Sequence, residues 1–195
     1  MNVKKRKIFL GLLALLLILI ISTLFILRWN DTSPERASHA LKQYIKHGKI
    51  ENLVLTIYYK DPSVLTLMPL SVDALVSGSY EHRVIITGNR LREHADLLSR
   101  MIDTDLTPVK YDEDYSYVNV RIYYVFESNR GRSIYNVTMW SGGENLFVNG
   151  SEVVSNSVFY DVLLPFLPDD AIAQLESYLL LRELVVFGSK EDTHS

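Results

Sequence analysis

The sequence predicts an α+β fold, with one N-terminal transmembrane helix followed by a single extracytoplasmic domain whose mainly antiparallel sheet is packed by helices. Three observations support this. The stretch Ile8–Leu27 carries no charged residue, Tyr115–Trp140 alternates between apolar and polar residues, and apolar residues recur at helical spacing on either side of that alternation. Helices and antiparallel strands in this mixed order are typical of a sheet with helices gathered on one face.

The segment Ile8–Leu27 is long and apolar enough to cross a bilayer. Of its 20 residues, 17 are apolar and none is charged. Twenty helical residues rise about 30 Å, which is the thickness of the hydrocarbon core. Because backbone amides in lipid have no water to bond, such a segment forms a helix. We expect a transmembrane helix over residues 8–28 and a basic cytoplasmic stub over residues 1–7.

The flanking charges orient this helix. Four basic residues precede it, namely Lys4, Lys5, Arg6 and Lys7. Cytoplasmic flanks carry the excess of Lys and Arg, so the N-terminus is expected in the cytoplasm and the remaining chain outside. Trp29 follows the segment, at the level where aromatic side chains anchor a helix in the interface. The sequence therefore predicts a single-pass protein of the cell membrane that contacts the lipid bilayer through residues 8–28.

A cleaved signal peptide is the alternative to an anchor. Signal peptides have an apolar core of about 7–15 residues, followed directly by a small-residue cleavage site. Here the apolar core runs for 20 residues and ends in Leu-Arg-Trp-Asn. An uncleaved anchor is therefore favoured.

The exported part is expected to begin with an amphipathic helix over residues 34–47, after a short linker at 29–33. Ser33 supplies an N-cap hydroxyl, and Pro34 suits the first helical position. Apolar residues then recur at helical spacing until Gly48, where the pattern ends. This helix would start directly outside the membrane.

Strands and helices are expected to alternate through the middle of the chain. The alternating, β-branched segment Leu53–Tyr59 predicts a strand, and Val64–Met68 is expected to return beside it as a second strand. A short helical turn at 71–76 and a strand at Glu81–Thr87 follow. The apolar stripe of Asn89–Ile102 then predicts one helix.

The segment Tyr115–Trp140 gives the clearest strand signal and predicts a β-hairpin. A tight turn in its centre pairs residues whose numbers sum to 261, because this register puts the apolar residues of both strands on one face. The register places Arg121 opposite Trp140, and Tyr123 opposite Thr138.

The last third of the chain predicts a second hairpin and two helices. Leu146–Val148 and Val153-Val154 are expected to pair around Asn149-Gly150, a strong signal for a type I′ turn. Helices are expected over residues 157–164 and 168–184. The polar tail at 188–195 shows no pattern and is expected to be disordered, so the folded domain is expected over residues 34–187.

Charge and cysteine content exclude several classes of function. The chain after residue 29 has 15 basic and 23 acidic residues, a net charge of 15 − 23 = −8. This balance argues against a nucleic-acid partner held by a basic surface. The chain contains no Cys, which excludes a disulfide scaffold, a Cys-ligated metal and a thiol nucleophile. An exported domain without Cys favours a bacterial cell envelope.

The sequence contains no enzyme motif, so catalysis is not favoured and no catalytic residue is assigned. It lacks a phosphate-binding loop, Gly-x-Ser-x-Gly and His-Glu-x-x-His. The acidic loop 103–114 carries the oxygen ligands that Ca²⁺ takes, but Pro108 stands where an EF-hand loop needs glycine. A solvated loop is preferred there, and no metal or cofactor is predicted.

The polar face of the predicted hairpin is the candidate binding surface. It carries Tyr117, Asn119, Arg121, Tyr123 and Trp140. An Arg stacked over a Trp forms a cation–π pair, and Tyr, Trp and Arg are enriched at the centres of protein interfaces. The alternative is that these side chains stabilise the sheet as cross-strand pairs or lie beneath the C-terminal helices.

We therefore expect a membrane-anchored, non-catalytic extracytoplasmic domain that binds a protein partner at the membrane or in the envelope. A ligand-sensing or regulatory subunit of a membrane complex is the second hypothesis, and an envelope hydrolase without a recognisable motif is the third. A flat aromatic face favours the first, and a pocket with two or more buried titratable groups favours the third. The net charge of −8 favours a basic or neutral protein over an anionic lipid or polymer.

Overall fold

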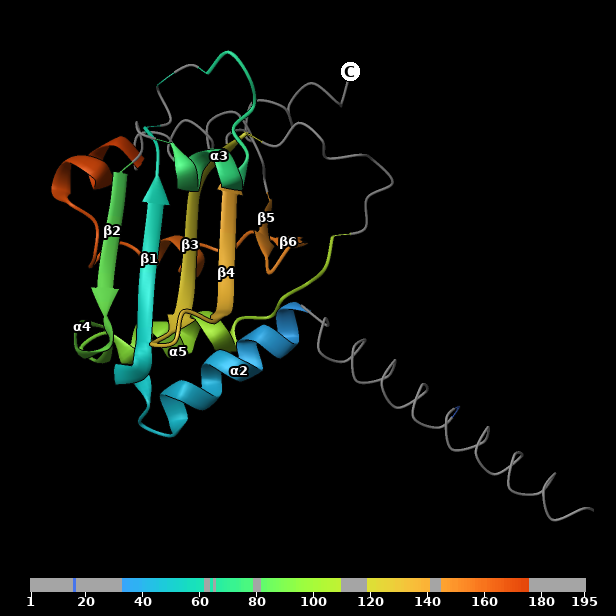
Figure 1. Ribbon diagram of the computed structural model, residues 1–195, viewed down its shortest axis with the longest axis vertical. Coiled ribbons are helices and arrows are strands. Elements are labelled where there is room, and N and C mark those ends of the chain that lie inside the picture. The colour runs from blue at the N-terminus through green and yellow to red at the C-terminus, as the bar shows by residue number, and fades with distance from the viewer. Residues whose placement is uncertain are drawn as a thin grey trace, which may run out of the picture. The chain divides into compact units, whose positions relative to one another are not determined.

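Figure 1 shows the computed structural model of the chain. It describes residue 16 and residues 33–61, 64, 66–78, 82–109, 119–140 and 145–175. Contacts divide the chain into two units, Met1–Thr32 and Ser33–Ser195, and the fold given below is that of the second unit.

One six-stranded antiparallel sheet forms the centre of this unit. Its strands are β1 (Leu53–Tyr59), β2 (His82–Thr87), β3 (Val120–Ser128), β4 (Ser133–Trp140), β5 (Asn145–Val148) and β6 (Ser151–Val154). Their order across the sheet is β2-β1-β3-β4-β5-β6 (Figure 1). Every neighbouring pair is antiparallel. The predicted α+β class with an antiparallel sheet is therefore confirmed.

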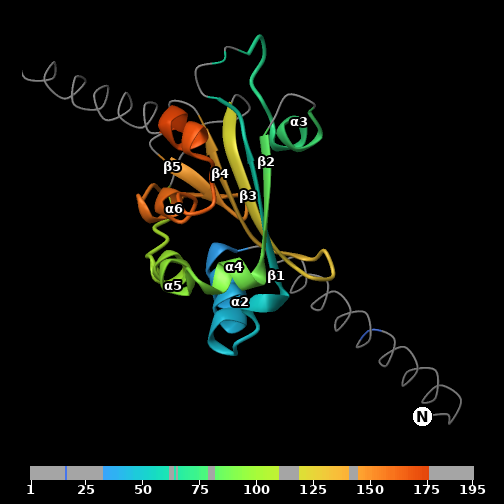
Figure 2. The same cartoon turned by 90° about the vertical axis from the view of Figure 1, so that its left-hand side faces the viewer.

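Short helices lie on both sides of the sheet, so the expectation that they gather on one face is wrong. They are α2 (Pro34–Lys46), the 3-10 turn η1 (Ile50–Asn52), α3 (Val72–Ser77), α4 (Gly88–Arg92), α5 (Ala95–Asp103) and α6 (Val158–Asp161). Figure 2 shows α5 and α6 on one side of the sheet and α3 on the other. We call the α5/α6 side the core face. The outer face is the opposite side, which carries Val54, Thr56 and Tyr58 of β1.

The first helix and the first strand form where the sequence predicts them. The hydroxyl oxygen of Ser33 accepts a hydrogen bond of 3.4 Å from the backbone N–H of Arg36, which caps α2. The helix ends at Lys46, and Gly48 follows with a positive φ of 62°. Strand β1 covers Leu53–Tyr59, as predicted.

The hydrophobic core lies between the core face and the helices that cover it. Leu55 and Ile57 of β1 and Tyr124 and Phe126 of β3 are fully buried there. The Tyr124 hydroxyl donates a hydrogen bond of 3.0 Å to the carbonyl oxygen of Phe159 in α6. This bond joins the sheet to α6 through the core.

The prediction of a strand at Val64–Met68 is wrong. The structure describes Val64, Thr66, Leu67 and Met68, and none of the four is in a strand. The strand that pairs with β1 on that side is β2, and β3 takes the other edge. Both hydrogen-bonding edges of β1 are therefore occupied, which leaves no place beside it for a further strand.

The single helix predicted over Asn89–Ile102 is two helices, α4 and α5. The chain turns between them at Glu93 and His94. The His94 ring packs edge-on against Phe166, with ring centroids 5.1 Å apart. Since α4 packs beside η1 while α5 packs beside α2 and α6, one straight helix could not reach all three neighbours.

The predicted hairpin register is confirmed in the middle and wrong at both ends, where Val120 pairs with Trp140 and Glu127 pairs with Ser133. Pairs from Ile122↔Met139 to Phe126↔Tyr135 sum to 261 as predicted. A register shift between Val120 and Ile122 places Val120, and not Arg121, opposite Trp140. Bulges depend on how the whole sheet packs, so alternation within one strand does not reveal them. The predicted cross-strand pair of Arg121 and Trp140 is therefore wrong.

The second hairpin forms as predicted. Asn149 and Gly150 both have positive φ, 49° and 81°, which is the requirement of a type I′ turn. The helix predicted over 157–164 is shorter, because α6 ends at Asp161. Of the helix predicted over 168–184, residues 169–175 are helical, and the remainder lies outside the described residues.

Part of the segment predicted as an acidic loop covers the edge of the sheet. The backbone N–H of Val109 donates to the carbonyl oxygen of Glu152 at 3.1 Å, and that of Val154 donates to Thr107 at 3.1 Å. Pro108 forms a bridge with Val153 in the same place. These contacts protect β6, which would otherwise expose unpaired backbone groups. Residues 110–114 of the loop lie outside the described residues.

The predicted anchor is outside the described residues, apart from Leu16. The stub 1–7, Trp29 in the linker and the tail 188–195 also lie outside the described residues. Within the described part of the chain, no helix combines the length and apolar character that a membrane span requires.

Candidate functional site

A row of residues crosses the outer face from one edge of the sheet to the other. Strand pairing aligns one residue from each strand, in the order Arg83, Tyr58, Tyr123, Thr138, Phe147 and Glu152. Residues directly opposite each other in an antiparallel sheet share a face, so their side chains are neighbours. We call this set the outer row. It has a cation at one end, an anion at the other and aromatic rings between them.

The first three members of the outer row touch one another. The rings of Tyr58 and Tyr123 are stacked, with centroids 6.1 Å apart and planes inclined by 30°. The guanidinium carbon of Arg83 lies 5.5 Å from the centroid of the Tyr58 ring. A cation at this distance is attracted by the ring quadrupole, by about 0.5–1 kcal/mol at an exposed site.

The surroundings of Tyr123 are apolar and acidic. Burial raises the pKa of the Tyr123 phenol, and the carboxylate of Glu127 adds to the increase. Tyr58 and Tyr123 are half-buried, whereas Arg83 is exposed. The Tyr123 phenol therefore stays neutral, and both rings are partly accessible on the outer face.

Helix α3 covers only part of the outer face. Its Leu75 side chain is fully buried, and the helix packs on β1 and β3. Ser71 caps α3 by accepting a hydrogen bond of 3.1 Å from the backbone N–H of Ala74. Beside the outer row, Ile85 of β2 is 54% exposed.

The structure places the predicted site residues in different surroundings. Tyr123 lies in the outer row. Arg121 is at the bulge and only 4% exposed. Asn119 accepts a hydrogen bond of 3.1 Å from the backbone N–H of Leu70, which ties the segment before α3 to the start of β3. Tyr117 and the side chain of Trp140 lie outside the described residues.

Of the outer row, only Tyr123 is among the predicted site residues, and the two residues in its contact series, Tyr58 and Arg83, were missed. Tyr58 alternates with the buried Ile57 and Tyr59, so its position on the opposite face could have been read from the strand pattern. The neighbours of Tyr58 on that face could not be read from the strand pattern, because they depend on the position of β1 between β2 and β3.

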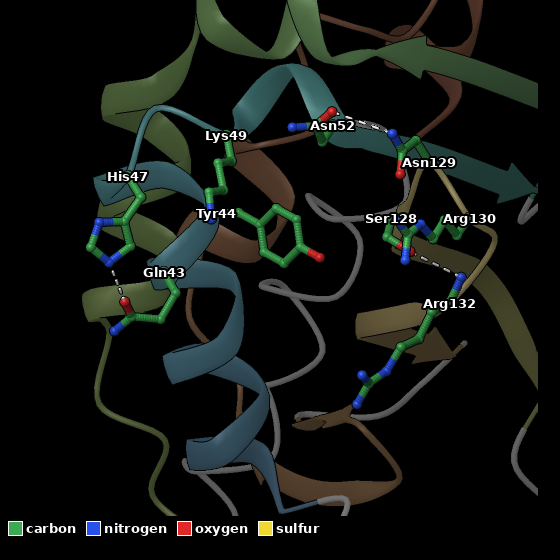
Figure 3. Close-up of a pocket in the computed structure, with 9 residues that line it drawn as sticks. All are labelled: Gln43, Tyr44, His47, Lys49, Asn52, Ser128, Asn129, Arg130 and Arg132. Atoms are coloured by element: carbon green, nitrogen blue, oxygen red, sulfur yellow. Dashed lines mark hydrogen bonds between the residues drawn. The ribbon is translucent and has the colours of Figure 1, made fainter.

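A cleft of about 580 Å³ is a second candidate site, formed by two segments far apart in the sequence. One is the end of α2 with η1, and the other is the turn between β3 and β4. Figure 3 shows the helix on one side, the turn on the other and the Tyr44 ring between them. Its lining residues are Gln43, Tyr44, His47, Lys49, Asn52, Ser128, Asn129, Arg130 and Arg132.

Hydrogen bonds fix the two walls of the cleft to each other. The backbone N–H of Asn129 donates to the carbonyl oxygen of Asn52 at 2.8 Å, and the two side-chain amides are 3.3 Å apart (Figure 3). In the turn, Ser128 exchanges backbone and hydroxyl hydrogen bonds with the backbone of Arg132. On the helix, the Gln43 side chain lies 2.7 Å from His47 Nε2.

The acidic loop is described only in part, and its described residues are not part of a metal-binding group. Among the described residues, no three His, Asp or Glu side chains are grouped so that they could hold a metal ion. Asp103 forms an ion pair with Lys42 of α2. Residues 112–114 lie outside the described part of the chain.

Comparison with known protein families, with curated protein sequences and with solved structures gave no match to this chain.

Proposed function

We propose that this chain is a single-pass, membrane-anchored protein whose exported, non-catalytic domain binds a protein partner through its outer face. The partner would lie at the membrane or in the envelope. The observation that carries the proposal is the contact series Arg83–Tyr58–Tyr123 on a face that α3 covers only in part.

The composition of this face matches that of protein interfaces. Interfaces have an apolar and aromatic centre enriched in Tyr and Arg, surrounded by a polar rim. The outer row has aromatic rings in its centre and ends in Arg83 and Glu152. Ile85 adds an exposed apolar side chain next to it. The net charge of −8 after residue 29 favours a basic or neutral partner.

Anchoring is supported by the sequence. The uncharged segment over residues 8–28 and the basic stub before it predict a cytoplasmic N-terminus and an exported domain. The chain has no Cys, so single cysteines give an unambiguous topology test. In intact cells, a membrane-impermeant maleimide should label Ser77→Cys, which replaces an exposed residue of α3, and should leave Lys5→Cys unlabelled. Labelling of both variants, or of Lys5→Cys alone, would contradict the proposed topology.

Partner binding is tested by substituting the outer row without disturbing the fold. Arg83→Gln and Tyr58→Ala should each reduce the amount of partner recovered after mild crosslinking in native membranes. Arg100→Gln on α5 makes the same charge change as Arg83→Gln at an exposed position away from the outer face. If all three variants recover the partner equally well, the outer face is not the binding surface.

A second function, that of a ligand-sensing or regulatory subunit in a membrane complex, is favoured by the cleft. Its volume of about 580 Å³ is in the range of small-molecule sites. A hydrolase is not favoured by this cleft, since the side chains of His47, Lys49, Arg130 and Arg132 are all exposed. Acid–base catalysis usually relies on buried groups with perturbed pKa values.

A further inference from the structure

The cleft is lined by basic residues, although the exported part of the chain is acidic overall. Residues after 29 carry a net charge of −8. The described lining of the cleft nevertheless contains Lys49, Arg130 and Arg132 and no acidic residue. The neighbouring Glu51 is bound in an ion pair to Arg92. Three cations therefore line one concavity in a domain where acidic residues are in excess.

The cations are held on rigid backbone. Gly131 has a positive φ of 73°, and its N–H donates to the carbonyl oxygen of Ser128 at 2.8 Å, which sets Arg130 and Arg132 on either side of a closed turn. Lys49 follows the end of α2, where its N–H donates to Tyr44 at 2.9 Å. Because the hydrogen bonds between Asn52 and Asn129 join the two segments, little backbone entropy remains to be lost on binding.

Stabilisation of the α2 C-terminus does not account for all of this charge. The negative end of a helix favours a nearby cation by about 0.3–1 kcal/mol, an effect that falls off within the last turn. Lys46 lies in the last turn and Lys49 just after it. Arg130 and Arg132 come from the other wall of the cleft, and the end of a helix does not explain their presence there.

We infer that the cleft binds a ligand that carries a phosphate group. Guanidinium groups match phosphate oxygens in geometry and bind them through two parallel hydrogen bonds. Lys49 adds a point charge, and the amides of Asn52 and Asn129 contribute one polar group from each wall. A volume of about 580 Å³ leaves room for an organic group beside the phosphate, next to the ring of Tyr44 (Figure 3).

This inference names the ligand class of the second candidate function and does not depend on the outer face. The phosphate could belong to a soluble phosphomonoester or to a lipid headgroup. Both present non-bridging phosphate oxygens to Arg130 and Arg132, so the experiment includes a probe for each source.

The full chain, purified in a nonionic detergent, is titrated calorimetrically with glycerol 3-phosphate and with glycerol. A second titration uses dihexanoyl phosphatidylglycerol, with dihexanoylglycerol as the lipid of equal chain length that lacks the phosphate. We expect the phosphate probe of one source to bind and its uncharged counterpart to show no saturable heat. Arg130→Gln and Arg132→Gln should each weaken that binding at least about tenfold, as expected for a charge-assisted hydrogen bond.

Two further variants show whether the effect belongs to the cleft. Arg100→Gln removes an exposed cation elsewhere and should leave the dissociation constant within about twofold, while Arg130→Lys keeps the charge and should retain part of the affinity. The three substituted side chains are exposed, so all four variants should melt at the temperature of the unmodified chain. Absence of binding by both phosphate probes, or equal affinity in Arg130→Gln and Arg100→Gln, overturns the inference. Either result would leave partner crosslinking at the outer face unchanged.

Discussion

The hydroxyl of Tyr124 in β3 donates a hydrogen bond of 3.0 Å to the backbone carbonyl oxygen of Phe159 in α6. Both residues are 0% exposed. This bond joins the centre of the sheet to the segment that follows its last strand. The outer face depends on it indirectly, because the same strand that anchors the core through Tyr124 presents Tyr123 to the other side.

Removing this hydroxyl should destabilise the domain. Tyr124→Phe keeps the ring and leaves a buried carbonyl without its donor, which costs about 1–2 kcal/mol. Urea unfolding of the full chain in a nonionic detergent, followed by tryptophan fluorescence, measures the change. Tyr123→Phe, which removes the hydroxyl of a half-buried neighbour, should change the unfolding free energy by less than about 0.5 kcal/mol. Equal effects from the two variants would contradict the role of Tyr124.

Stability should fall at alkaline pH. Burial raises the pKa of Tyr124 and Tyr135 above the ordinary value of 10.0. The folded state therefore keeps these protons while the unfolded chain loses them, and the stabilisation present below pH 10 decreases as pH rises towards the folded pKa values. By pH 11 the loss is on the order of 1 kcal/mol for each tyrosine. Urea unfolding at pH 8, 10 and 11 should show this decrease, and Tyr124→Phe should reduce it. A pH-independent unfolding free energy would contradict it.

Gly88 should tolerate no side chain. A Cβ at this position would overlap the Cα of Glu51 and the carbonyl oxygen of Ile50, because the start of α4 lies directly against η1. Gly88→Ala should therefore lower the unfolding free energy by about 1–3 kcal/mol. Asn89→Ala, at the next position and exposed, is the matched control and should have little effect. If Gly88→Ala were as stable as its control, α4 could not pack on η1 as described.

The contact between Arg83 and Tyr58 should appear as a coupling energy. A double-mutant cycle with Arg83→Gln and Tyr58→Leu isolates the cation–π term, for which we expect about 0.5–1 kcal/mol. The four unfolding free energies come from the same urea experiment. A coupling below about 0.3 kcal/mol would show that the two side chains do not interact in solution.

Local sequence patterns predicted most of the elements. Ser33 and Pro34 marked the start of α2, alternation marked β1, and Asn149-Gly150 marked the last hairpin. Each of these signals acts within a few residues of where it stands. The strand expected at Val64–Met68 failed for a long-range reason, since β2 occupies the edge of β1 that it would need.

The candidate sites were less predictable than the elements. Tyr123 was identified from its strand, but its contact with Tyr58 arises from the position of β1 beside β3. Arg121 was expected on an exposed face opposite Trp140, and a bulge that alternation cannot reveal placed Val120 there instead. The cleft combines the end of α2 with a turn whose residues are more than 75 positions later in the chain, so no sequence window contains both walls.

Site-specific photocrosslinking from Ile85 tests the central claim most directly. A photoreactive amino acid at this exposed position of the outer face is activated in native membranes, and Asp96 on α5 serves as the exposed control position. Binding through the outer face predicts one discrete adduct from Ile85 and none from Asp96, and Arg83→Gln should reduce the Ile85 adduct. No adduct from Ile85, or the same adduct from both positions, would contradict it.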